Sequence, residues 1–416
     1  LHEALENIDI GGVTLLRAAA KNFENVIVVV DTKDYGWIAE KLKSKSLSSV
    51  TVEERKKLAV KAFQHVVHYD SLIAAYLESQ LEGNNTKQEP PQTVSRVYQN
   101  PMKLKYGVNP HQSPAAIYQI HNNKSSSLPF KVLNGTPGYI NLLDAFNAWQ
   151  LVKELRLAVG LPAAASFKHV SPAGAAVAVP LTAEERDIYE IPQDKNITPV
   201  ALAYIRARNA DPMCSYGDFA AVSDVVDEET ALILKTEVSD GIIAPGFHPK
   251  ALEILKQKKN GAYIVLEMDA NYEAEDVEYR EVYGIGFMQK RNNALITSKN
   301  FTEVVTKAKN LSEEAVRDLI VASITLKYTQ SNSVGYAIRG QMIGVGAGQQ
   351  SRVDCTKLAG TKVENWWLRF HPKVRGLPFV SGTKRVDRTN TRVHYIDNNL
   401  SEPDQKLLEN APQPLT

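Results

Sequence analysis

Lys168 and His169 are adjacent residues whose side chains suit acid–base chemistry. They follow the apolar run Pro-Ala-Ala-Ala-Ser-Phe at 162–167, which predicts a short buried strand, and precede Ser-Pro-Ala-Gly at 171–174. Ligands bind at strand ends in open α/β sheets, so both side chains can face one cavity there. A histidine takes up protons near neutral pH, and a lysine steadies a developing oxyanion or protonates a leaving nitrogen. The pair therefore suits acyl transfer to a weak amine, although a surface lysine beside a backbone-bonded histidine is the commoner interpretation of such a dipeptide.

A glycine cluster followed by an arginine offers a candidate anion site. Gly344-Val-Gly-Ala-Gly348 precedes Arg352 by a few residues. Small residues let backbone amides approach an anion, and a guanidinium can grip phosphate through two hydrogen bonds. The cluster lacks the Gly-x-Gly-x-x-Gly spacing, so a dinucleotide fold is not supported. A plain turn after a strand is an equally good interpretation.

Three further places are weaker candidates for ligand contacts. Asn332 can form hydrogen bonds with a carboxamide, although such an asparagine is more often a turn residue. Asp240, before Gly241, can accept hydrogen bonds from ribose hydroxyls or can cap a turn. Lys105-Tyr106 combines a cation with an aromatic ring, which fits phosphate binding or an ordinary loop. None of these is specific when taken alone.

Asp9 and Lys21 bracket an Ala-rich helical pattern near the start of the chain. On one straight helix they would lie roughly 18 Å apart, so their spacing does not favour a shared site. The alternative interpretation is an acid at a helix start and a base at a helix end, as the helix dipole prefers.

The order of predicted elements indicates helices alternating with strands and therefore an α/β fold with mixed or parallel sheets. A Thr51–Glu54 capping box opens one helix, and Asn141 is the expected N-cap of another. The polar, proline-containing segment 82–97 predicts an interdomain linker, with a boundary near residue 98. Beyond about Gly376 no closing helix or strand is evident. The predicted helices are 13–21, 52–67, 69–81, 141–155 and 312–327, and the predicted strands are 26–30, 162–167, 240–246, 262–266 and 341–345.

Composition excludes several classes of protein. The 416 residues carry a formal net charge of +1, from 48 basic and 47 acidic side chains, which offers no excess charge for nucleic acid or an anionic membrane. Cys214 and Cys355 cannot form a disulfide framework or a four-ligand zinc site, and a reducing compartment, the cytosol, fits best. No apolar run approaches the roughly 20 residues that a bilayer requires. The chain begins with leucine and ends in a patternless tail, so we expect it to be cut from a longer protein at both ends.

Taken together, eight segments resemble the family of bifunctional purine biosynthesis proteins, in which an IMP cyclohydrolase is joined to an AICAR transformylase. They run in order along the chain, and the longest, around Lys168-His169, is too specific for chance. The segments are Ile8–Gly12, Arg17–Asn22, Tyr106–Gln112, Val132–Gly135, Ala165–Ala176, Val238–Gly246, Gln330–Ser333 and Gly346–Arg352.

The resemblance implies three domains or parts of domains. Residues 1–98 would be the C-terminal part of a methylglyoxal-synthase-like α/β cyclohydrolase domain with its linker. Residues 99–308 and 309–416 would be two subdomains of a cytidine-deaminase-like α/β transformylase with mixed sheets, the second of them incomplete. A zinc deaminase with that fold would be a rival, but its His-x-Glu and Pro-Cys-x-x-Cys motifs are absent from the sequence.

The resemblance also implies roles for individual residues. His169 matches the proton acceptor and Lys168 the transition-state stabiliser of formyl transfer, while Lys21 matches the residue assigned to ring closure and Asp9 a nucleotide contact. Lysine at 105 departs from the arginine expected there, which keeps the charge but loses the two-pronged grip. The residues that match AICAR contacts of the family are Lys105, Tyr106, Gly217, Asp240, Asn332 and Arg352. Val353 matches a position beside the folate.

The implied reaction is formylation of AICAR by 10-formyltetrahydrofolate to FAICAR, and, in the full-length protein, closure of FAICAR to IMP with loss of water. No transition metal is implied, and a monovalent cation, potassium, is left open. Family members are homodimers, with no nucleic-acid or membrane partner expected. If 416 residues are the whole molecule, we expect no cyclohydrolase activity and impaired transformylase activity. The alternative is a truncated dimeric fragment that binds nucleotide without turnover.

Overall fold

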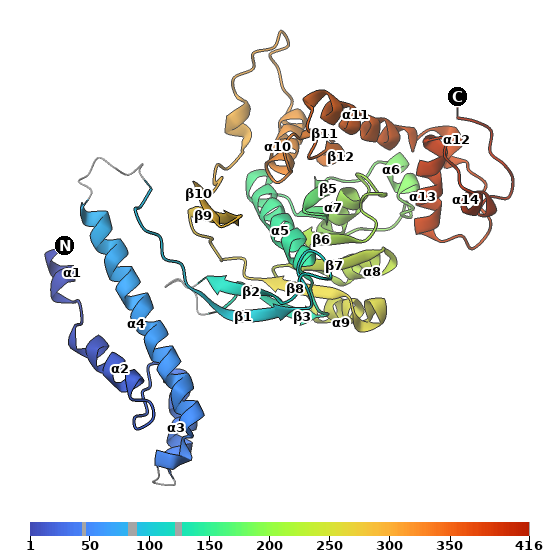
Figure 1. Cartoon of the computed structure of the whole chain (residues 1–416). Helices are drawn as coiled ribbons and strands as arrows, with labels where there is room; N and C mark the ends of the chain where they lie inside the picture. Colours follow the sequence, from blue (N-terminus) through green and yellow to red (C-terminus); the bar gives the residue numbers. More distant parts are fainter. Residues whose placement is uncertain (44–46, 82–89, 121–126, 416) are drawn as a thin grey trace. The chain divides into compact units, whose positions relative to one another are not determined.

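The computed structural model describes residues 1–43, 47–81, 90–120 and 127–415, and the chain forms two compact units (Figure 1). The N-terminal unit comprises Leu1–Asn100 and Tyr118–Ser126, and the sheet unit comprises Pro101–Ile117 and Ser127–Thr416. Each unit has its own apolar core and is described separately.

Helices dominate the N-terminal unit. α2 (Gly11–Lys21) packs against α4 (Val52–Leu81), with α1 (His2–Glu6) before them and α3 (Tyr35–Leu42) between them in the chain. Ala20, Leu58 and Ala62 form the centre of its core. The capping box at the start of α4 is confirmed: the amide of Glu54 donates to Thr51 Oγ1 at 3.2 Å, and the amide of Thr51 donates to Glu54 Oε2 at 2.9 Å. The two helices predicted at 52–67 and 69–81 form this single helix.

The strand predicted at 26–30 is wrong. These residues pair with no strand, and the described part of residues 1–97 contains none at all. A strand requires a partner for its backbone hydrogen bonds, so this apolar run instead buries Val28 against the helices. The preceding turn is held by Arg55, whose guanidinium donates to the carbonyls of Phe23 at 2.9 Å and Glu24 at 2.8 Å. The α/β expectation for this part of the chain is therefore not met by the described residues.

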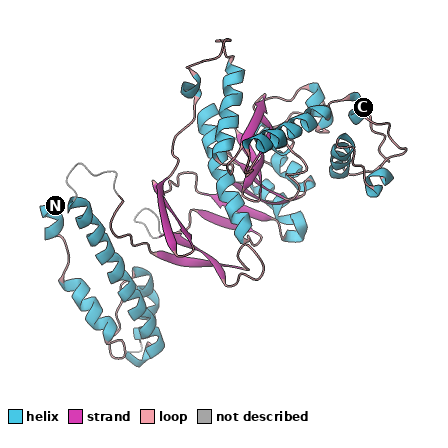
Figure 2. Ribbon diagram, turned by 45° about the horizontal axis from the view of Figure 1, so that its top comes forward, coloured by secondary structure: helices cyan, strands magenta, loops and turns pink. Residues whose placement is uncertain are grey.

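An eight-stranded mixed sheet organises the second unit (Figure 2). Neighbours pair in the order β11-β12-β5-β4-β6-β7-β8-β3; β6, β7 and β8 are parallel, and the other pairs are antiparallel. The mixed α/β class predicted from the sequence is confirmed. The strands are β3 (Phe130–Asn134), β4 (Ala163–Lys168), β5 (Ser171–Val177), β6 (Asp218–Val222), β7 (Ser239–Ala244), β8 (Ile264–Met268), β11 (Val334–Ile338) and β12 (Gln341–Gly346).

Helices cover both faces of this sheet. α5 (Tyr139–Val159) and α10 (Glu313–Lys327) pack on one face, and α7 (Pro199–Arg208), α8 (Glu228–Thr236) and α9 (Pro249–Gln257) belong to the core of the other. Successive side chains of a strand point to opposite faces, so Ala163, Ala165 and Phe167 of β4 join the first core and Ala164 the second. β4 is therefore buried on both sides and delivers its last residue to an edge of the sheet.

Glycines allow close approach of helices to the sheet. A Cβ on Gly174 of β5 would lie 2.2 Å from the carbonyl oxygen of Ala207 on α7. α11 (Arg352–Leu368) packs as closely on β12, because a Cβ on Gly344 would lie 2.5 Å from the carbonyl oxygen of Ala359. These positions have no room for a side chain, which explains the small residues of β5 and β12.

Most predicted elements of the sheet unit are confirmed, with differences at their ends. α5 begins at Tyr139 rather than after an Asn141 cap; Asn141 lies inside the helix, and its Oδ1 accepts a hydrogen bond of 3.0 Å from the amide of Gly138. The expectation of no helix after Gly376 is wrong, because α13 (Arg385–Ile396) and α14 (Glu402–Lys406) follow. α13 is held by a distant residue, since Arg388 binds Glu190, whereas the buried Asp404 of α14 binds the nearby Thr391, His394 and Ser401.

The remaining elements are small. Two further two-stranded sheets pair β1 (Tyr98–Leu104) with β2 (Ala115–Ile120) and β9 (Val277–Val282) with β10 (Ile285–Lys290), and α6 (Ala183–Ile188) and α12 (Pro372–Arg375) complete the helices used below. Much of the predicted linker, residues 82–89, lies outside the described residues. No helix in the described ranges is long and apolar enough to cross a membrane.

Candidate functional site

His169 and Val170 form the two-residue turn between β4 and β5. Lys168 pairs with Ser171 across the turn, and both central residues have positive φ, 51° for His169 and 63° for Val170. That geometry matches a type I′ hairpin, which normally uses asparagine or glycine. A β-branched residue at positive φ is unusual, so neighbouring groups must hold the turn in place. The predicted junction of strand and loop is thus a tight, strained turn.

Asp144 of α5 anchors this turn through a hydrogen bond to its backbone. Its Oδ1 accepts a hydrogen bond of 2.5 Å from the amide of Val170, and the residue is only 5% exposed. Burial raises the pKa of the Asp144 carboxyl to about 6, against the lowering effects of the Val170 amide, His169 and Lys168. A buried carboxylate with a raised pKa beside a histidine and a lysine is typical of a functional site.

Lys168 is held by the segment that enters β6. Its Nζ donates to the carbonyl oxygen of Gly217 at 2.8 Å, and Gly217 has a φ of 74°. A Cβ at Gly217 would lie 2.9 Å from that ammonium nitrogen. The glycine therefore serves both the backbone conformation and the position of the lysine.

Asp240 lies at the same edge of the sheet. β6 and β7 run parallel, and Asp218 pairs with Ser239 at their beginnings, next to the end of antiparallel β4. Asp240 forms an ion pair with Lys259, and its charge contributes to the raised pKa of Asp144. The Asp240 carboxylate is thus close enough to Asp144 to influence its protonation.

Asn332 and Arg352 come to this edge from the other side of the turn. β12 runs antiparallel to β5, so its last residue, Gly346, lies where β5 begins, and Val334 of β11 pairs with Gly346. Asn332 precedes β11, and its Nδ2 donates to the carbonyls of Gln349 at 3.0 Å and Gln350 at 3.2 Å. Arg352 is the first residue of α11, where the helix N-terminus favours anions. Val353 follows it and is 63% exposed.

The glycine cluster before Arg352 divides into two kinds of position. Gly346, like Gly344, lies within β12, and a Cβ there would lie 2.5 Å from the carbonyl oxygen of Cys355. Only Gly348, with a φ of 65°, lies in the turn that leads to α11. Two of the three glycines are therefore explained by the packing of α11 on β12. Only the turn at Gly348 and the N-terminus of α11 remain as candidate anion-binding groups.

Two candidate groups are not brought to this edge by any described contact. Lys105 and Tyr106 follow β1, where the Lys105 ammonium lies 6.0 Å from the centre of the Tyr106 ring. In the N-terminal unit, Asp9 Oδ1 accepts from the amide of Gly12 at 2.9 Å, before α2, whereas Lys21 is the last residue of α2. Asp9 and Lys21 therefore occupy opposite ends of one helix, as their alternative interpretation expects.

A buried charge network lies behind the edge. Arg208 Nε donates to Glu237 Oε2 at 2.7 Å, and its Nη1 lies 3.0 Å from Asp218 Oδ1 in an ion pair without hydrogen-bonding geometry. Asp218 Oδ2 accepts a hydrogen bond of 2.6 Å from Ser166 Oγ. Burial raises the pKa of Asp218, while Arg208, Ser166 and Ser239 lower it. This network fixes the start of β6, just after Gly217.

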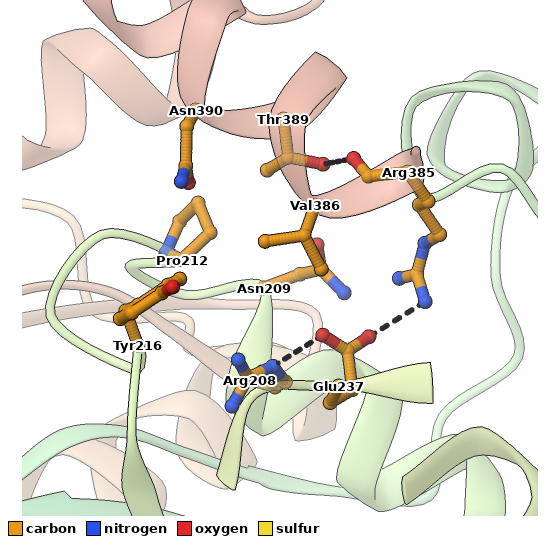
Figure 3. Close-up of a pocket in the computed structure, with 9 residues that line it drawn as sticks. All are labelled: Arg208, Asn209, Pro212, Tyr216, Glu237, Arg385, Val386, Thr389 and Asn390. Atoms are coloured by element: carbon orange, nitrogen blue, oxygen red, sulfur yellow. Dashed lines mark hydrogen bonds and ion pairs between the residues drawn. The ribbon is translucent and has the colours of Figure 1, made fainter. Parts of the chain in front are cut away.

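A shallow pocket opens beside this network (Figure 3). Its two arginines, Arg208 and Arg385, both bind Glu237, at 2.7 and 2.6 Å. Arg208 donates through Nε to Glu237 and through Nη1 and Nη2 to the carbonyls of Ser215 and Val238. The charges of the two arginines are balanced by Glu237 and Asp218, so we assign no ligand here. The lining residues are Arg208, Asn209, Pro212, Tyr216, Glu237, Arg385, Val386, Thr389 and Asn390.

Sequence reasoning missed Asp144 and Lys259. Asp144 lies on the predicted apolar face of α5, where a charged residue between Leu142 and Ala145 was the available signal. Lys259 lies in a segment with no chemical pattern, and only its contact with Asp240 identifies it. Among the described residues, no group of three or more His, Cys, Asp or Glu side chains could hold a metal ion.

The fold and the edge together define an α/β protein with candidate acid–base and anion-binding groups at one end of a mixed sheet. Residues 19–362 match the family model described as the AICARFT/IMPCHase bienzyme. The chain is 37% identical over 361 residues to the bifunctional purine biosynthesis protein PurH of Acetivibrio thermocellus, covering 86% of this chain and 64% of that protein. The chain is 34% identical over 392 residues to PurH of Dictyostelium discoideum, covering 88% of this chain and 68% of that protein.

The chain belongs to the AICARFT/IMPCHase bienzyme family. A third relative, PurH of Bacillus mycoides, is 34% identical over 362 residues, 86% of this chain and 64% of that protein. The chain thus spans slightly less than two thirds of two of these three relatives.

Proposed function

We propose that the sheet unit transfers a formyl group from 10-formyltetrahydrofolate to the 5-amino group of AICAR, a step of de novo purine synthesis. One observation carries the proposal: the Lys168-His169 turn lies at the sheet edge to which Gly217, Asp240 and Asn332 also come. Membership of the bienzyme family and the printed names of the relatives support it.

The acceptor amine is a weak nucleophile because its lone pair is delocalised into the ring and the carboxamide, so a base must remove a proton during attack. His169 is the proposed base. Lys168 is the proposed partner of the developing oxyanion, since its ammonium already lies at the same edge. As the new bond between the amine nitrogen and the formyl carbon forms, the amine proton goes to the imidazole. The bond between the formyl carbon and N10 of the folate then breaks, and the imidazolium returns the proton to N10, so that tetrahydrofolate leaves.

Substrate contacts are proposed from the family resemblance, which includes Lys105 and Tyr106, and from the groups around the Lys168-His169 pair. Arg352 at the start of α11, together with Lys105 and Tyr106, is proposed to hold the AICAR phosphate. Asp240 is proposed to accept hydrogen bonds from ribose hydroxyls through Oδ2, since its Oδ1 pairs with Lys259. Asn332, whose Nδ2 donates to the carbonyls of Gln349 and Gln350, would accept a hydrogen bond from the carboxamide through Oδ1. Gly217 would contact the substrate through its backbone, and Val353 would lie beside the folate.

The wider expectations stay proposals. Asp9 and Lys21 are proposed to act in the closure of FAICAR to IMP. The methylglyoxal-synthase-like and cytidine-deaminase-like folds and the domain boundaries at 98 and 308 remain predictions. We also expect a cytosolic homodimer without nucleic-acid or membrane partners. A potassium ion is left open, and no step is assigned to it.

The proposal is tested by comparing formyl transfer and AICAR binding for the wild type, His169→Ala and the control His248→Ala. His248 follows β7 at the opposite edge of the sheet. We expect His169→Ala to lower transfer by about 10²- to 10⁴-fold with AICAR binding retained, and His248→Ala to change neither. Equal rates for wild type and His169→Ala would overturn the assignment. AICAR binding by the wild type without transfer would favour a fragment that binds nucleotide without turnover.

A further inference from the structure

Asp144 is the buried carboxylate beneath the Lys168-His169 turn. We propose that Asp144 is a positioning residue that fixes this turn through the Val170 amide and places a negative charge beside His169. The inference rests on the proposed function of the pair, because the charge matters only if His169 takes up a proton. It concerns a residue that does not itself touch the substrate.

The need for an anchor follows from the backbone. His169 and Val170 both have positive φ without being glycine, and such residues persist only where surrounding contacts hold them. The 2.5 Å hydrogen bond from Val170 to Asp144 is such a contact. Its acceptor does not move freely, because Leu142 and Ala145 on the same helix are fully packed in the sheet core. α5 thereby fixes the direction in which the His169 side chain leaves the turn.

The charge of Asp144 has a second effect. The charged groups that influence it are His169 and Lys168 from the turn and Asp240 from β7. As the imidazole accepts the amine proton it becomes a cation. The nearby carboxylate of Asp144 is held in place and only 5% exposed, so it stabilises that cation even though His169 itself is exposed. Asp144 can therefore favour the proton transfer without donating or accepting a proton itself.

Stability alone would not favour this charge. Burial raises the carboxyl pKa to about 6 from 3.8, so the folded state binds the proton more tightly than the unfolded state. The resulting stabilisation is fully present below pH 3.8 and is lost as the pH rises through about 6. Asparagine could accept the same hydrogen bond without a buried charge, so a purely structural role predicts that Asp144→Asn is harmless or beneficial at every pH.

The first test needs no enzymatic activity. In a His169→Ala background, where the neighbouring imidazole no longer titrates, the amide resonance of Val170 in the full chain should shift with pH, and the shift should be absent when Asp144→Asn is added. The melting temperature of Asp144→Asn relative to the wild type should rise between pH 4 and pH 8. A Val170 amide that responds neither to pH nor to Asp144→Asn would overturn the inference, even if His169→Ala still abolishes formyl transfer.

The second test separates hydrogen bond from charge. We expect Asp144→Ala to lower kcat for formyl transfer by about 10²-fold and Asp144→Asn, which keeps the acceptor, by about tenfold, with little change in KM. Glu154→Gln is the matched control: this residue is buried on the same helix but binds Lys327 at 2.8 Å, away from the turn. Wild-type kcat in Asp144→Asn would overturn the electrostatic part, and equal kcat for the Ala and Asn variants would overturn the positioning part. If the Val170 amide titrates in a chain that transfers no formyl group, the contact between Val170 and Asp144 is supported and the proposed function is refuted instead.

Discussion

The sheet unit brings together candidate residues that are distant in the sequence, whereas the N-terminal unit keeps apart candidate residues that are close in the sequence. In the sheet unit, Lys168 and Arg352 lie far apart in the chain, yet the strand order brings both to one edge. In the N-terminal unit, Asp9 and Lys21 are near neighbours in the sequence, yet α2 holds them at opposite ends. The difference shows that a sheet collects distant residues at its strand ends, whereas a helix separates nearby ones by its rise.

The units also differ in how charges support them. Glu185 of α6 binds Arg206 of α7 at 2.8 Å and Arg339 of the β11–β12 turn at 2.7 Å, and Glu185 and Arg206 are fully buried. In the N-terminal unit, Asp34 binds Lys61 at 2.6 Å, but the Lys61 side chain is 45% exposed. The sheet unit thus depends on a buried ion network that the N-terminal unit lacks among its described pairs.

The largest expected effect comes from removing that buried charge. Glu185→Gln leaves Arg206 without its carboxylate in the core and should lower the free energy of unfolding of the sheet unit by about 3–5 kcal/mol. Asp34→Asn in the N-terminal unit should cost about 0–1 kcal/mol, since its partner is half exposed. Urea denaturation followed by hydrogen exchange in each unit measures both. Similar losses in the two units would contradict this contrast.

The Glu185→Gln variant also predicts a pH dependence of stability. Burial raises the pKa of Glu185, but Arg206, the Thr182 amide and Arg339 outweigh it and hold that pKa below its usual value. The stabilisation by a lowered carboxyl pKa is present above the ordinary value of 4.5 and is lost as the pH falls through the lower folded value. The wild type should therefore lose its advantage over Glu185→Gln as the pH is lowered below 4.5.

A smaller effect should distinguish two lysines. Lys168→Met keeps the length of the side chain but removes the charge at the sheet edge, and it should lower formyl transfer by about 10²- to 10³-fold. Lys21→Met at the end of α2 should leave transfer unchanged. Steady-state kinetics of both variants measures the contrast. A comparable loss in Lys21→Met would mean that the two units are functionally coupled in formyl transfer.

The smallest expected effect concerns two glycines of positive φ. Gly217→Ala should destabilise by about 1 kcal/mol through backbone strain and should also lower transfer by about tenfold, because the new Cβ meets the Lys168 ammonium. Gly284, with a φ of 77° in the β9–β10 turn, has nothing within 4 Å of its ideal Cβ. Gly284→Ala should therefore show the same loss of stability without a loss of activity. Equal activities in the two variants would separate Gly217 from the site.

Local patterns in the sequence predicted most single elements correctly. The capping box at Thr51 and the strand before Lys168 depend on neighbouring residues only, and both are present in the structure. The order of the strands in the sheet, by contrast, depends on pairing between distant segments. The apolar run at 26–30 shows the limit, since its residues suit a strand but the described chain provides no partner for it.

For the candidate site, the sequence by itself determined the reactive residue types at positions 168 and 169 and the strand that carries them, because a short continuous apolar run is a local property. Only the tertiary structure placed Asp144 beneath the turn, Gly217 against the lysine and Asp240 nearby. Those relations arise from strand pairing and helix packing between residues that are distant along the chain. The raised pKa of Asp144 is likewise a consequence of burial, which no spacing of residues along the chain can reveal.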